Sequence, residues 1–316
     1  MVLLYGLTGT SYLPEIAEQL SKMTFSSHPA LMLGIILVTA GFGFKISAVP
    51  FQMWAPDVYE GAPTPITGFL SVASKAAGFA VILRVFYSMM ESASFSVDWA
   101  NLIAIISVLS MTIGNLIAIR QTNIKRMLAY STIAQAGYLM VGLAAITTLP
   151  GGDDMAGPSG ILFYLAGYAM TNLTAFGVII AVTNLKDDDL ISSFSGLGRK
   201  HPFLAAGLTL SMISLIGIPP TVGFMAKVYI FGSAIDTGFA WLAVAGVINS
   251  VISAYYYLRV VKIMFLSDKS SESEILRPSF GGSAAVLITA LSTFIFGIYP
   301  TPIIELAQNA IQSIVI

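Results

Sequence analysis

The sequence predicts an all-α polytopic membrane protein, a bundle of about eight transmembrane helices. Hydrophobic residues make up 56% of the 316 positions and charged residues only 10%, which leaves too few polar side chains to cover a water-soluble domain. The apolar runs are ~20 residues long, about the length that a helix needs to cross ~30 Å of hydrocarbon. They lack the strict alternation of barrel strands, so we expect helices.

The amino-terminal part is expected to contribute no complete span. Residues 1–9 are apolar but too short to cross a bilayer, and neither a basic segment nor a cleavage site marks a signal peptide. We expect them to be the end of a helix whose beginning is missing. Residues 13–23 place Ile16, Leu20 and Met23 on one face, which predicts a short interfacial helix.

The predicted spans are bounded by charged or Gly/Pro-rich loops. They cover approximately residues 31–53, 64–88, 99–119, 127–148, 159–184, 202–235, 239–265 and 283–300, and an amphipathic tail follows at 302–316. The sixth span would be ~50 Å long as one straight helix. We expect Pro219 and Pro220 to break it, because proline removes an amide donor and clashes with the preceding turn. Pro50 is expected to break the first span in the same way.

Loop charge predicts how the chain crosses the membrane. Basic residues collect in the loops after the third, fifth and seventh spans, and acidic residues collect in the intervening loops. Basic loops stay on the cytoplasmic side, so both ends of the chain are expected on the outer side. The loop that carries Asp57 and Glu60 is expected inside although it holds no basic residue.

Three lysines within the apolar spans are the candidate functional residues, namely Lys45, Lys75 and Lys227. Each is expected to lie far from either end of its span, and no acidic residue is expected inside a span. A charge at the bilayer midplane costs about 2.5–3.5 kcal/mol, so such residues usually line a hydrated path or pair with a carboxylate. A desolvated lysine can gain and lose a proton near neutral pH, which arginine cannot. We therefore predict proton transfer at these lysines, and the alternative is that they snorkel to an interface.

Two of these lysines lie close to proline breaks. Lys45 precedes Pro50 in the first span, and Lys227 follows Pro220 in the sixth. Because the two spans are an odd number of helices apart, they cross the membrane in opposite directions. Interrupted helices in opposite directions are typical of transporters built from inverted repeats, whose sites lie at the breaks.

Redox chemistry is expected on other chains. There is no cysteine, so the chain holds neither a disulfide nor a thiolate-bound iron–sulfur cluster or zinc. Its histidines, His28 and His201, both fall in expected loops, which leaves no pair to ligate an intramembrane haem. The series Tyr255, Tyr256 and Tyr257 is expected to be packing and interface surface. We expect no nucleic-acid partner and no metal site.

Three segments carry a family resemblance. They are GFGFKISAVPFQMWAPDVYEGAPTPITGFLSVASK at 41–75, NIKRMLAYSTIAQAGYLMVG at 123–142 and SLIGIPPTVGFMAKVYIF at 214–231. In this order they resemble the antiporter-like subunit N of bacterial complex I, and the similarity extends over essentially the whole chain. The resemblance implies a proton-translocating membrane-arm subunit of NADH:quinone oxidoreductase, an antiporter-like bundle of two inverted five-helix repeats with broken helices. It matches Lys45, Lys75 and Lys227 to lysines of the family's seventh, eighth and twelfth helices.

The resemblance also implies an organisation and partners. Residues 1–98 are expected to be the remnant of the first repeat, 99–265 the second repeat, and 266–316 the last transmembrane helix and the tail. The family is longer at its amino end, and its additional helices carry a glutamate thought to pair with the lysine that Lys45 matches. Flavin, iron–sulfur clusters, NADH and quinone are expected on partner subunits. The chain would contact other membrane-arm subunits and lipid, in a bacterial plasma membrane or a thylakoid-type membrane.

One position departs from the family pattern, and alternatives stay open. Gln135 stands where many relatives carry histidine, and because its amide cannot titrate, a relay there needs water, with Tyr138 or Tyr168 as neighbours. The first alternative function is a subunit of a multi-subunit cation/proton antiporter or membrane-bound hydrogenase. The second is an inert structural member of the membrane arm.

Overall fold

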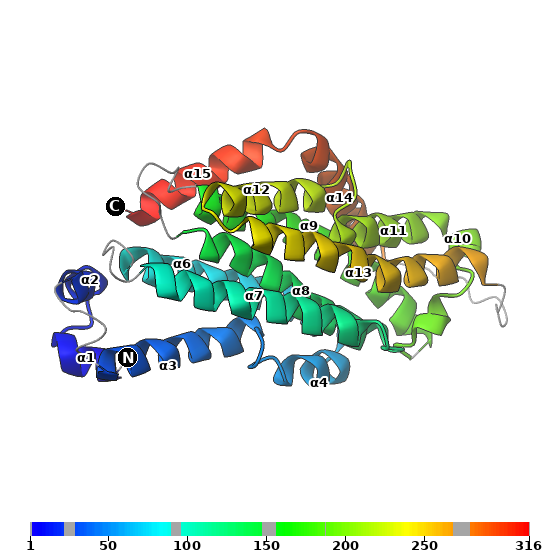
Figure 1. The fold of residues 1–316 in the computed structure, drawn as a ribbon. Helices are drawn as coiled ribbons and strands as arrows, with labels where there is room; N and C mark the ends of the chain where they lie inside the picture. The colour runs from blue at the N-terminus through cyan, green and yellow to red at the C-terminus, as the bar shows by residue number, and fades with distance from the viewer. Residues whose placement is uncertain are drawn as a thin grey trace.

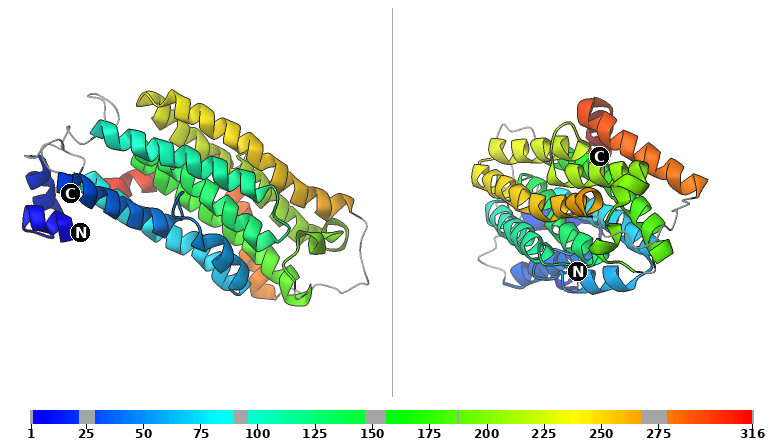
Figure 2. Two further views of the ribbon diagram at one scale, coloured as in Figure 1. Left: turned by 60° about the horizontal axis from the view of Figure 1, so that its bottom comes forward. Right: turned by 90° about the vertical axis from the view of Figure 1, so that its right-hand side faces the viewer.

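The computed structural model describes residues 2–21, 29–89, 96–146, 156–186, 188–267 and 279–315. In these ranges the regular structure is helical, and the one β-type pairing is an isolated antiparallel bridge between Asn123 and Leu190. The long helices run along a common direction and form a bundle when viewed end on (Figures 1 and 2). This is the all-α membrane fold that the composition predicts.

Seven helical segments of the described chain are long and apolar enough to cross a membrane. They are α3 (Pro29–Ile46), Thr64–Val85, most of α7 (Ser96–Ala118), α8 (Ile124–Ala144), most of α9 (Ala156–Lys186), α13 (Ala240–Leu266) and α14 (Phe280–Ile298). The segment Thr64–Val85 consists of α5 (Thr64–Phe69), a π-helical stretch (Leu70–Ser74) and the start of α6 (Lys75–Met89). The shorter helices are α1 (Val2–Thr8), α2 (Leu13–Ser21), α4 (Trp54–Gly61), α10 (Leu197–Lys200), α11 (Pro202–Ile216), α12 (Val222–Asp236) and α15 (Thr301–Val315).

The sixth expected span consists of two half-helices, α11 and α12. Helix α11 ends at Gly217, whose positive φ of 89° closes the last turn. The amide of Gly217 donates to the Ser214 carbonyl at 3.0 Å, and that of Ile218 donates to the Ile213 carbonyl at 3.2 Å, which is the Schellman pattern of a helix end. Pro219 and Pro220 follow this cap, so the chain breaks where the sequence predicts. Each of the two has 15 residues and is shorter than the seven segments named above.

The first expected span is shorter than predicted, since α3 ends at Ile46 and not near residue 53. Ser47 takes a left-handed conformation with φ of 61°, and its amide donates to the Phe44 carbonyl at 3.2 Å. Pro50 prevents a straight continuation, because in a helix its ring would clash with the carbonyl of Ile46. The chain continues instead into the separate short helix α4. Lys45 therefore lies in the last turn of α3, whereas we expected it to lie far from a helix end.

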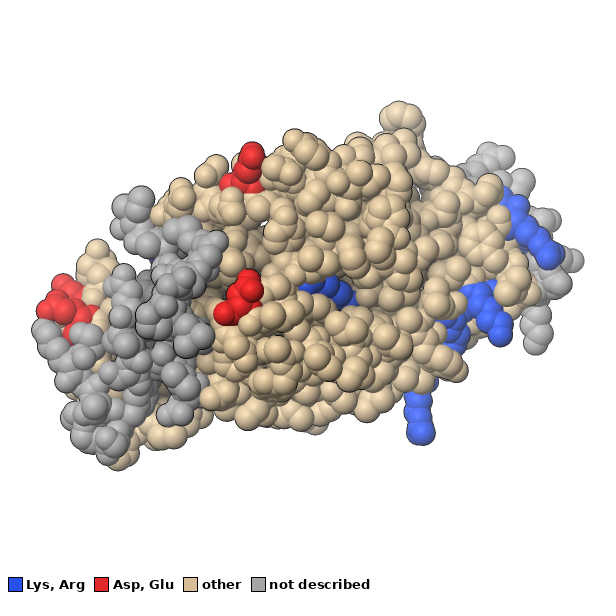
Figure 3. Space-filling model, turned by 45° about the horizontal axis from the view of Figure 1, so that its top comes forward, with Lys and Arg blue, Asp and Glu red and all other residues tan. Residues whose placement is uncertain are grey.

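Charged side chains separate toward the two ends of the bundle. Figure 1 shows the chain termini at one end and α10, with Arg199 and Lys200, at the other. On the face drawn in Figure 3, acidic side chains lie toward the end with the termini, and most lysines and arginines lie toward the opposite end. This separation agrees with the alternation of loop charge along the sequence.

Asp57 and Glu60, which we expected in a loop, lie in the short helix α4 and pair with a basic residue from a distant part of the chain. Arg126 at the start of α8 contacts Asp57 at 2.8 Å and Glu60 at 2.5 Å. The neighbouring Lys125 contacts Asp189 at 2.7 Å and donates to the Ala62 carbonyl at 3.0 Å. Asp57 and Glu60 are thus paired with a cation in the region that charge patterning assigns to the basic side.

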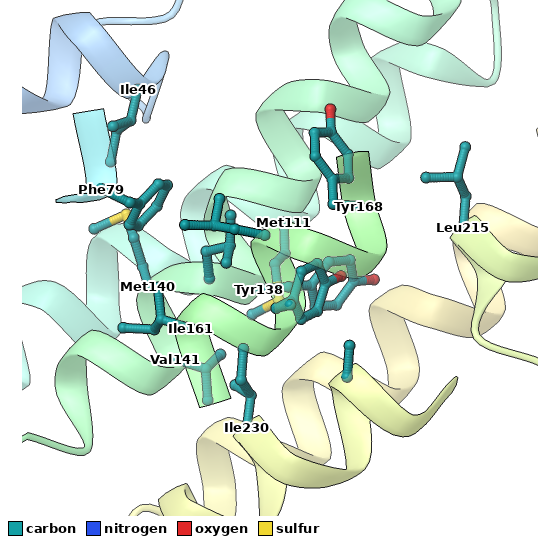
Figure 4. Packing of buried hydrophobic residues seen from close by; sticks show 14 of the residues in the cluster. Ile46, Phe79, Met111, Tyr138, Met140, Val141, Ile161, Tyr168, Leu215 and Ile230 are labelled. Atoms are coloured by element: carbon teal, nitrogen blue, oxygen red, sulfur yellow. The ribbon is translucent and has the colours of Figure 1, made fainter. Parts of the chain in front are cut away.

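Helix α8 forms the centre of the bundle. Each of its residues except Arg126 and Tyr130 is buried. Helix α7 packs so closely against it that a side chain at Gly114 would collide with the backbone of Tyr130 and Ala134. Figure 4 shows part of the surrounding core, in which Tyr138 of α8 and Tyr168 of α9 lie among apolar side chains. The polar residues of α8 are thus held in the middle of the molecule.

Candidate proton-transfer site

Lys75 lies at the start of α6, directly after the π-helical stretch, and is only 3% exposed. Its ammonium donates to the backbone carbonyl of Thr132 in α8 at 2.6 Å. The ring of Tyr168 lies 5.9 Å from the same nitrogen, and the Tyr168 hydroxyl is 2.9 Å from the hydroxyl of Thr132. π-Helical turns occur frequently at functional sites, and here the turn leads into a buried cation.

Lys227 in α12 is 5% exposed and is held by the end of α11. Its ammonium donates to the carbonyls of Ile216 at 2.7 Å and Leu215 at 3.2 Å, and to the Ser250 hydroxyl at 2.9 Å. The last carbonyls of a helix have no intrahelical partner and carry partial negative charge. The ring of Tyr138 lies 4.2 Å from the nitrogen, within range of a cation–π contact. The helix break therefore supplies the negative end that a carboxylate would otherwise provide.

No carboxylate of the described chain pairs with either of these lysines. The buried charged residues in that part are Lys75, Lys125 and Lys227. Only Lys125 has an acidic partner, Asp189. Lys75 and Lys227 are stabilised by carbonyls, a hydroxyl and aromatic rings, which are weaker partners than a carboxylate.

Gln135 connects α8 to the same carbonyl that holds Lys227. Its amide nitrogen donates to the Leu215 carbonyl at 3.2 Å and to the Tyr257 hydroxyl at 3.5 Å. Its amide oxygen accepts a hydrogen bond from Tyr164. Because a carboxamide does not titrate, Gln135 fixes its neighbours in place and leaves proton transfer to hydroxyls and water.

Further hydroxyl groups lie on α8 and α13, the helices that carry Gln135 and the Ser250 partner of Lys227. Tyr257 and Ser131 share a short hydrogen bond, and the Ser250 hydroxyl lies 3.3 Å from that of Tyr138. A hydroxyl donates one proton and accepts another, so it can pass a proton without a net change of charge. With Thr132 and Tyr168, these groups line a polar zone inside an apolar core.

The structure brings together most of the predicted site residues. Lys75, Tyr168, Gln135, Tyr138 and Lys227 all border this polar zone. Pro219 and Pro220 lie in the break whose carbonyls hold Lys227.

Lys45 and Pro50 lie outside the zone. Lys45 is exposed and makes no hydrogen bond or ion pair with another residue of the described chain. A role for Lys45 in proton transfer stays a prediction.

Several residues of the zone escaped the sequence analysis, above all Tyr164, Ser250 and Tyr257. We expected Tyr257 to serve packing, yet it is fully buried and bonded to Ser131 and Gln135. Tyr255 is 63% exposed, as an interface residue would be. Ser250 and Tyr257 are seven residues apart, so they share one face of α13, and this spacing was the available signal.

The polar zone is suited to holding and passing protons. In the described ranges no group of three or more His, Asp or Glu side chains is placed to hold a metal ion. Two lysines can each bind one proton, and the hydroxyls of the zone can transfer it.

Comparison with known proteins identifies relatives. A family model described as NADH:quinone oxidoreductase/Mrp antiporter, TM, matches residues 1–253. A protein of Heliobacterium modesticaldum named NADH-quinone oxidoreductase subunit N is 47% identical, with 99% of this chain and 63% of that protein aligned. A protein of Moorella thermoacetica with the same name is 46% identical over 98% of this chain and 62% of its own length. The chain thus spans somewhat less than two thirds of these curated relatives.

Solved structures show the same architecture. A chain of the membrane-bound sulfane sulfur reductase, an archaeal respiratory membrane complex, matches with a TM-score of 0.87 and 29% identity, covering 99% of this chain and 62% of its own. A chain of respiratory complex I from Thermus thermophilus with bound aureothin matches with a TM-score of 0.75 and 31% identity, covering 96% and 63%. A chain of the Mrp complex from Dietzia has a TM-score of 0.84 at 21% identity, covering 99% and 64%, and this likeness concerns the fold alone.

Proposed function

We propose that this chain, which belongs to the NADH:quinone oxidoreductase/Mrp antiporter family of transmembrane proteins, translocates protons. It would do so in the membrane arm of an NADH:quinone oxidoreductase. The observation that carries the proposal is the pair of buried lysines, Lys75 and Lys227, each held by backbone carbonyls and without a carboxylate partner in the described chain. The relatives named subunit N, at 46% and 47% identity, support the choice of complex.

Each lysine has a role in this proposal. Lys75 holds a proton against the Thr132 carbonyl, and Lys227 holds one against the end of α11. A proton that leaves one ammonium moves to a neighbouring hydroxyl or water, which releases its own proton to the next group. The last proton in the series is taken up by the neutral amine of the other lysine, so no charge remains on tyrosine or serine. Gln135 orients the middle of this series without changing its own protonation.

Lys45 is proposed as a third proton-holding site. It stands at the end of α3 with its ammonium exposed, so a partner carboxylate would come from outside the described residues. Residues 1–98 are proposed as part of the first inverted repeat, 99–265 as the second repeat, and 266–316 as the last transmembrane helix and tail. The breaks after Ile46 and after Ile216 are the pseudo-equivalent features of the two repeats.

Electron transfer is assigned to partner subunits in this proposal. They would hold the flavin and the iron–sulfur clusters and react with NADH and quinone, while this chain contacts other membrane-arm subunits and lipid. The membrane would be a bacterial plasma membrane or a thylakoid-type membrane. The end of the bundle with the acidic side chains and both termini would face the outer side, since basic ends stay in the cytoplasm.

A second candidate is a subunit of a cation/proton antiporter. It is favoured by the matching family model, whose description names the Mrp antiporter beside NADH:quinone oxidoreductase. It differs in a measurable way, because its proton movement would require Na⁺ or another cation on the opposite side and would not require quinone.

The proposal is tested with Lys227→Ala in the complete complex, with Lys200→Ala at the exposed basic end as the matched control. We expect Lys227→Ala to lower proton pumping and coupled quinone reduction while leaving electron entry from NADH to an artificial acceptor intact. Parental pumping in Lys227→Ala would make this chain an inert member of the arm. If the unmodified complex pumps protons without quinone but stops pumping without Na⁺, the antiporter function is favoured.

A further inference from the structure

Helix α13 carries two stripes of polar side chains that face different neighbours. Ser250 and Tyr257 face the proposed site, where they contact Lys227 and Gln135. Asn249 and Tyr256, each one residue earlier, face α7. Because successive helical residues are about 100° apart around the axis, the rotation that serves one stripe also sets the other.

The α7-facing stripe forms a buried polar seam with Thr112 and Asn115, called here the α7–α13 seam. The Asn115 amide nitrogen donates to the backbone carbonyl of Asn249 at 3.0 Å and to its side-chain oxygen at 3.3 Å. The Asn249 amide nitrogen donates to the Thr112 hydroxyl at 3.2 Å and to the Ala245 carbonyl at 3.0 Å. Tyr256 donates to the Asn115 side-chain oxygen at 2.9 Å. The side chains of Asn115, Asn249 and Tyr256 are all buried.

The seam is satisfied in one arrangement only. Each carboxamide uses both of its N–H groups and its oxygen, so turning either amide over would bring donor against donor or acceptor against acceptor. A rotation or slip of α13 by one residue would leave these groups buried and unpaired, which is unfavourable where no water replaces the lost partner.

The exposed side of α13 does little to fix its rotation. Its middle part is mainly apolar there, with exposed side chains at Val244, Val247, Ile248 and Val251. Apolar side chains gain nothing from one rotation over another against lipid tails. Arg259, three residues after Tyr256, also donates to the carbonyls of Ile119 and Gln121, just beyond the end of α7. The directional contacts of α13 with its neighbours are therefore those of the two polar stripes and of Arg259.

We infer that the α7–α13 seam positions the proton-transfer groups of α13. Asn115 and Asn249 lock the rotation and register of the helix, and this lock holds Ser250 against Lys227 and Tyr257 against Gln135. These are positioning residues, because they touch neither lysine. The inference rests on the proposed function, since that function gives Ser250 and Tyr257 their role.

The functional test compares an apolar seam with a matched loss of hydrogen bonds elsewhere. The triple variant Asn115→Leu/Asn249→Leu/Tyr256→Phe, called here the apolar seam, keeps the size of these side chains and removes the hydrogen bonds between them. Thr174→Val/Thr289→Val removes a 2.8 Å bond between α9 and α14 as the control. We expect the apolar seam to lower coupled proton translocation about tenfold at unchanged quinone KM, and the control to stay within about twofold. Tyr256→Phe alone removes one bond and should give an intermediate loss in an otherwise intact seam.

A combination of variants separates positioning from general damage. In a background that already carries Ser250→Ala and Tyr257→Phe, we expect the apolar seam to add little further loss, because the groups that it positions are gone. If the apolar seam lowers proton translocation in that background by the same factor as in the parental chain, the inference is overturned.

A structural measurement tests the seam apart from function. The chain has no cysteine, so spin labels can be placed at Leu109 of α7 and Val251 of α13, both exposed, in the full chain in lipid nanodiscs. In the parental chain we expect a narrow distribution of distances between the two labels. This distribution should broaden or shift in the apolar seam, and to a lesser degree in Tyr256→Phe. An unchanged distribution in the apolar seam overturns the inference. Failure of the proposed function shows instead as a Lys227→Ala variant that pumps normally.

Discussion

The Lys227 ammonium and the Gln135 carboxamide donate to one acceptor, the carbonyl oxygen of Leu215, each at 3.2 Å. This carbonyl belongs to the last turn of α11, which ends there because Gly217 and the two prolines interrupt the span. A helix break in the sequence thus becomes a shared acceptor in the structure. The lysine of α12 and the amide of α8 are coupled through it.

Gln135→Leu should lower coupled proton translocation by about five- to tenfold. The substitution keeps the volume but leaves the Tyr164 hydroxyl and one lone pair of Leu215 without a partner, and an unsatisfied buried polar group costs ~1–3 kcal/mol. Gln308→Leu on the exposed side of α15 is the control and should pump normally. An unaffected Gln135→Leu variant would remove Gln135 from the site.

Ser250→Ala should lower the rate of coupled translocation by about tenfold, because a hydrogen bond to a charged group contributes ~1.5–3 kcal/mol and the Lys227 ammonium loses one. Ser292→Ala on α14 removes a serine that bonds only to its own helix, at the Ile288 carbonyl, and serves as the control. The measurement is the rate of proton uptake that accompanies quinone reduction in proteoliposomes. Equal rates for the two variants would show that Ser250 does not assist Lys227.

Asp189→Asn should destabilise the protein more than Glu60→Gln does. Asp189 is the carboxylate partner of the buried Lys125, so its neutralisation leaves a poorly compensated cation and costs ~1–3 kcal/mol after allowance for its partial exposure. Glu60→Gln leaves Arg126 paired with Asp57 at a solvent-accessible site and should cost less than ~1 kcal/mol. Thermal unfolding in detergent compares the two, and a larger loss for Glu60→Gln would contradict the ranking.

The proposed orientation predicts which residues an impermeant thiol reagent reaches. Lys200→Cys at the end of α10 should be labelled from the cytoplasmic side, and Asp236→Cys at the end of α12 from the outer side. Because the chain has no cysteine of its own, any label on it reports the introduced residue. Labelling of both from one side would contradict the orientation and the path of α12.

Much of the fold was predictable because hydrocarbon imposes simple requirements on a helix. Apolar runs of sufficient length located the spans to within several residues, and Pro219 and Pro220 located the break between α11 and α12. The end of α3 was misjudged, because the residues after Ile46 are as apolar as those before it. Only the left-handed Ser47 and the geometry of Pro50 end the helix.

The site was predictable only in part, because its lysines are visible in the sequence and their partners are not. Lys75 and Lys227 stood out as charges in apolar runs. Their partners are backbone carbonyls of Thr132, Leu215 and Ile216, which no residue type announces. The hydroxyls of Ser250 and Tyr257 come from a helix whose rotation depends on contacts with α7. Such contacts join residues more than a hundred positions apart.

The central claim is that Lys75 and Lys227 belong to one proton path. It is tested most directly by a double-mutant cycle with Lys75→Ala, Lys227→Ala and their combination, measured as protons pumped per two electrons in the complete complex. If the lysines act in series, each single variant lowers the ratio and the combination lowers it no further than the more damaging single variant. Losses that add in full would mean that the two lysines serve separate paths, and a parental ratio in all three variants would contradict the account.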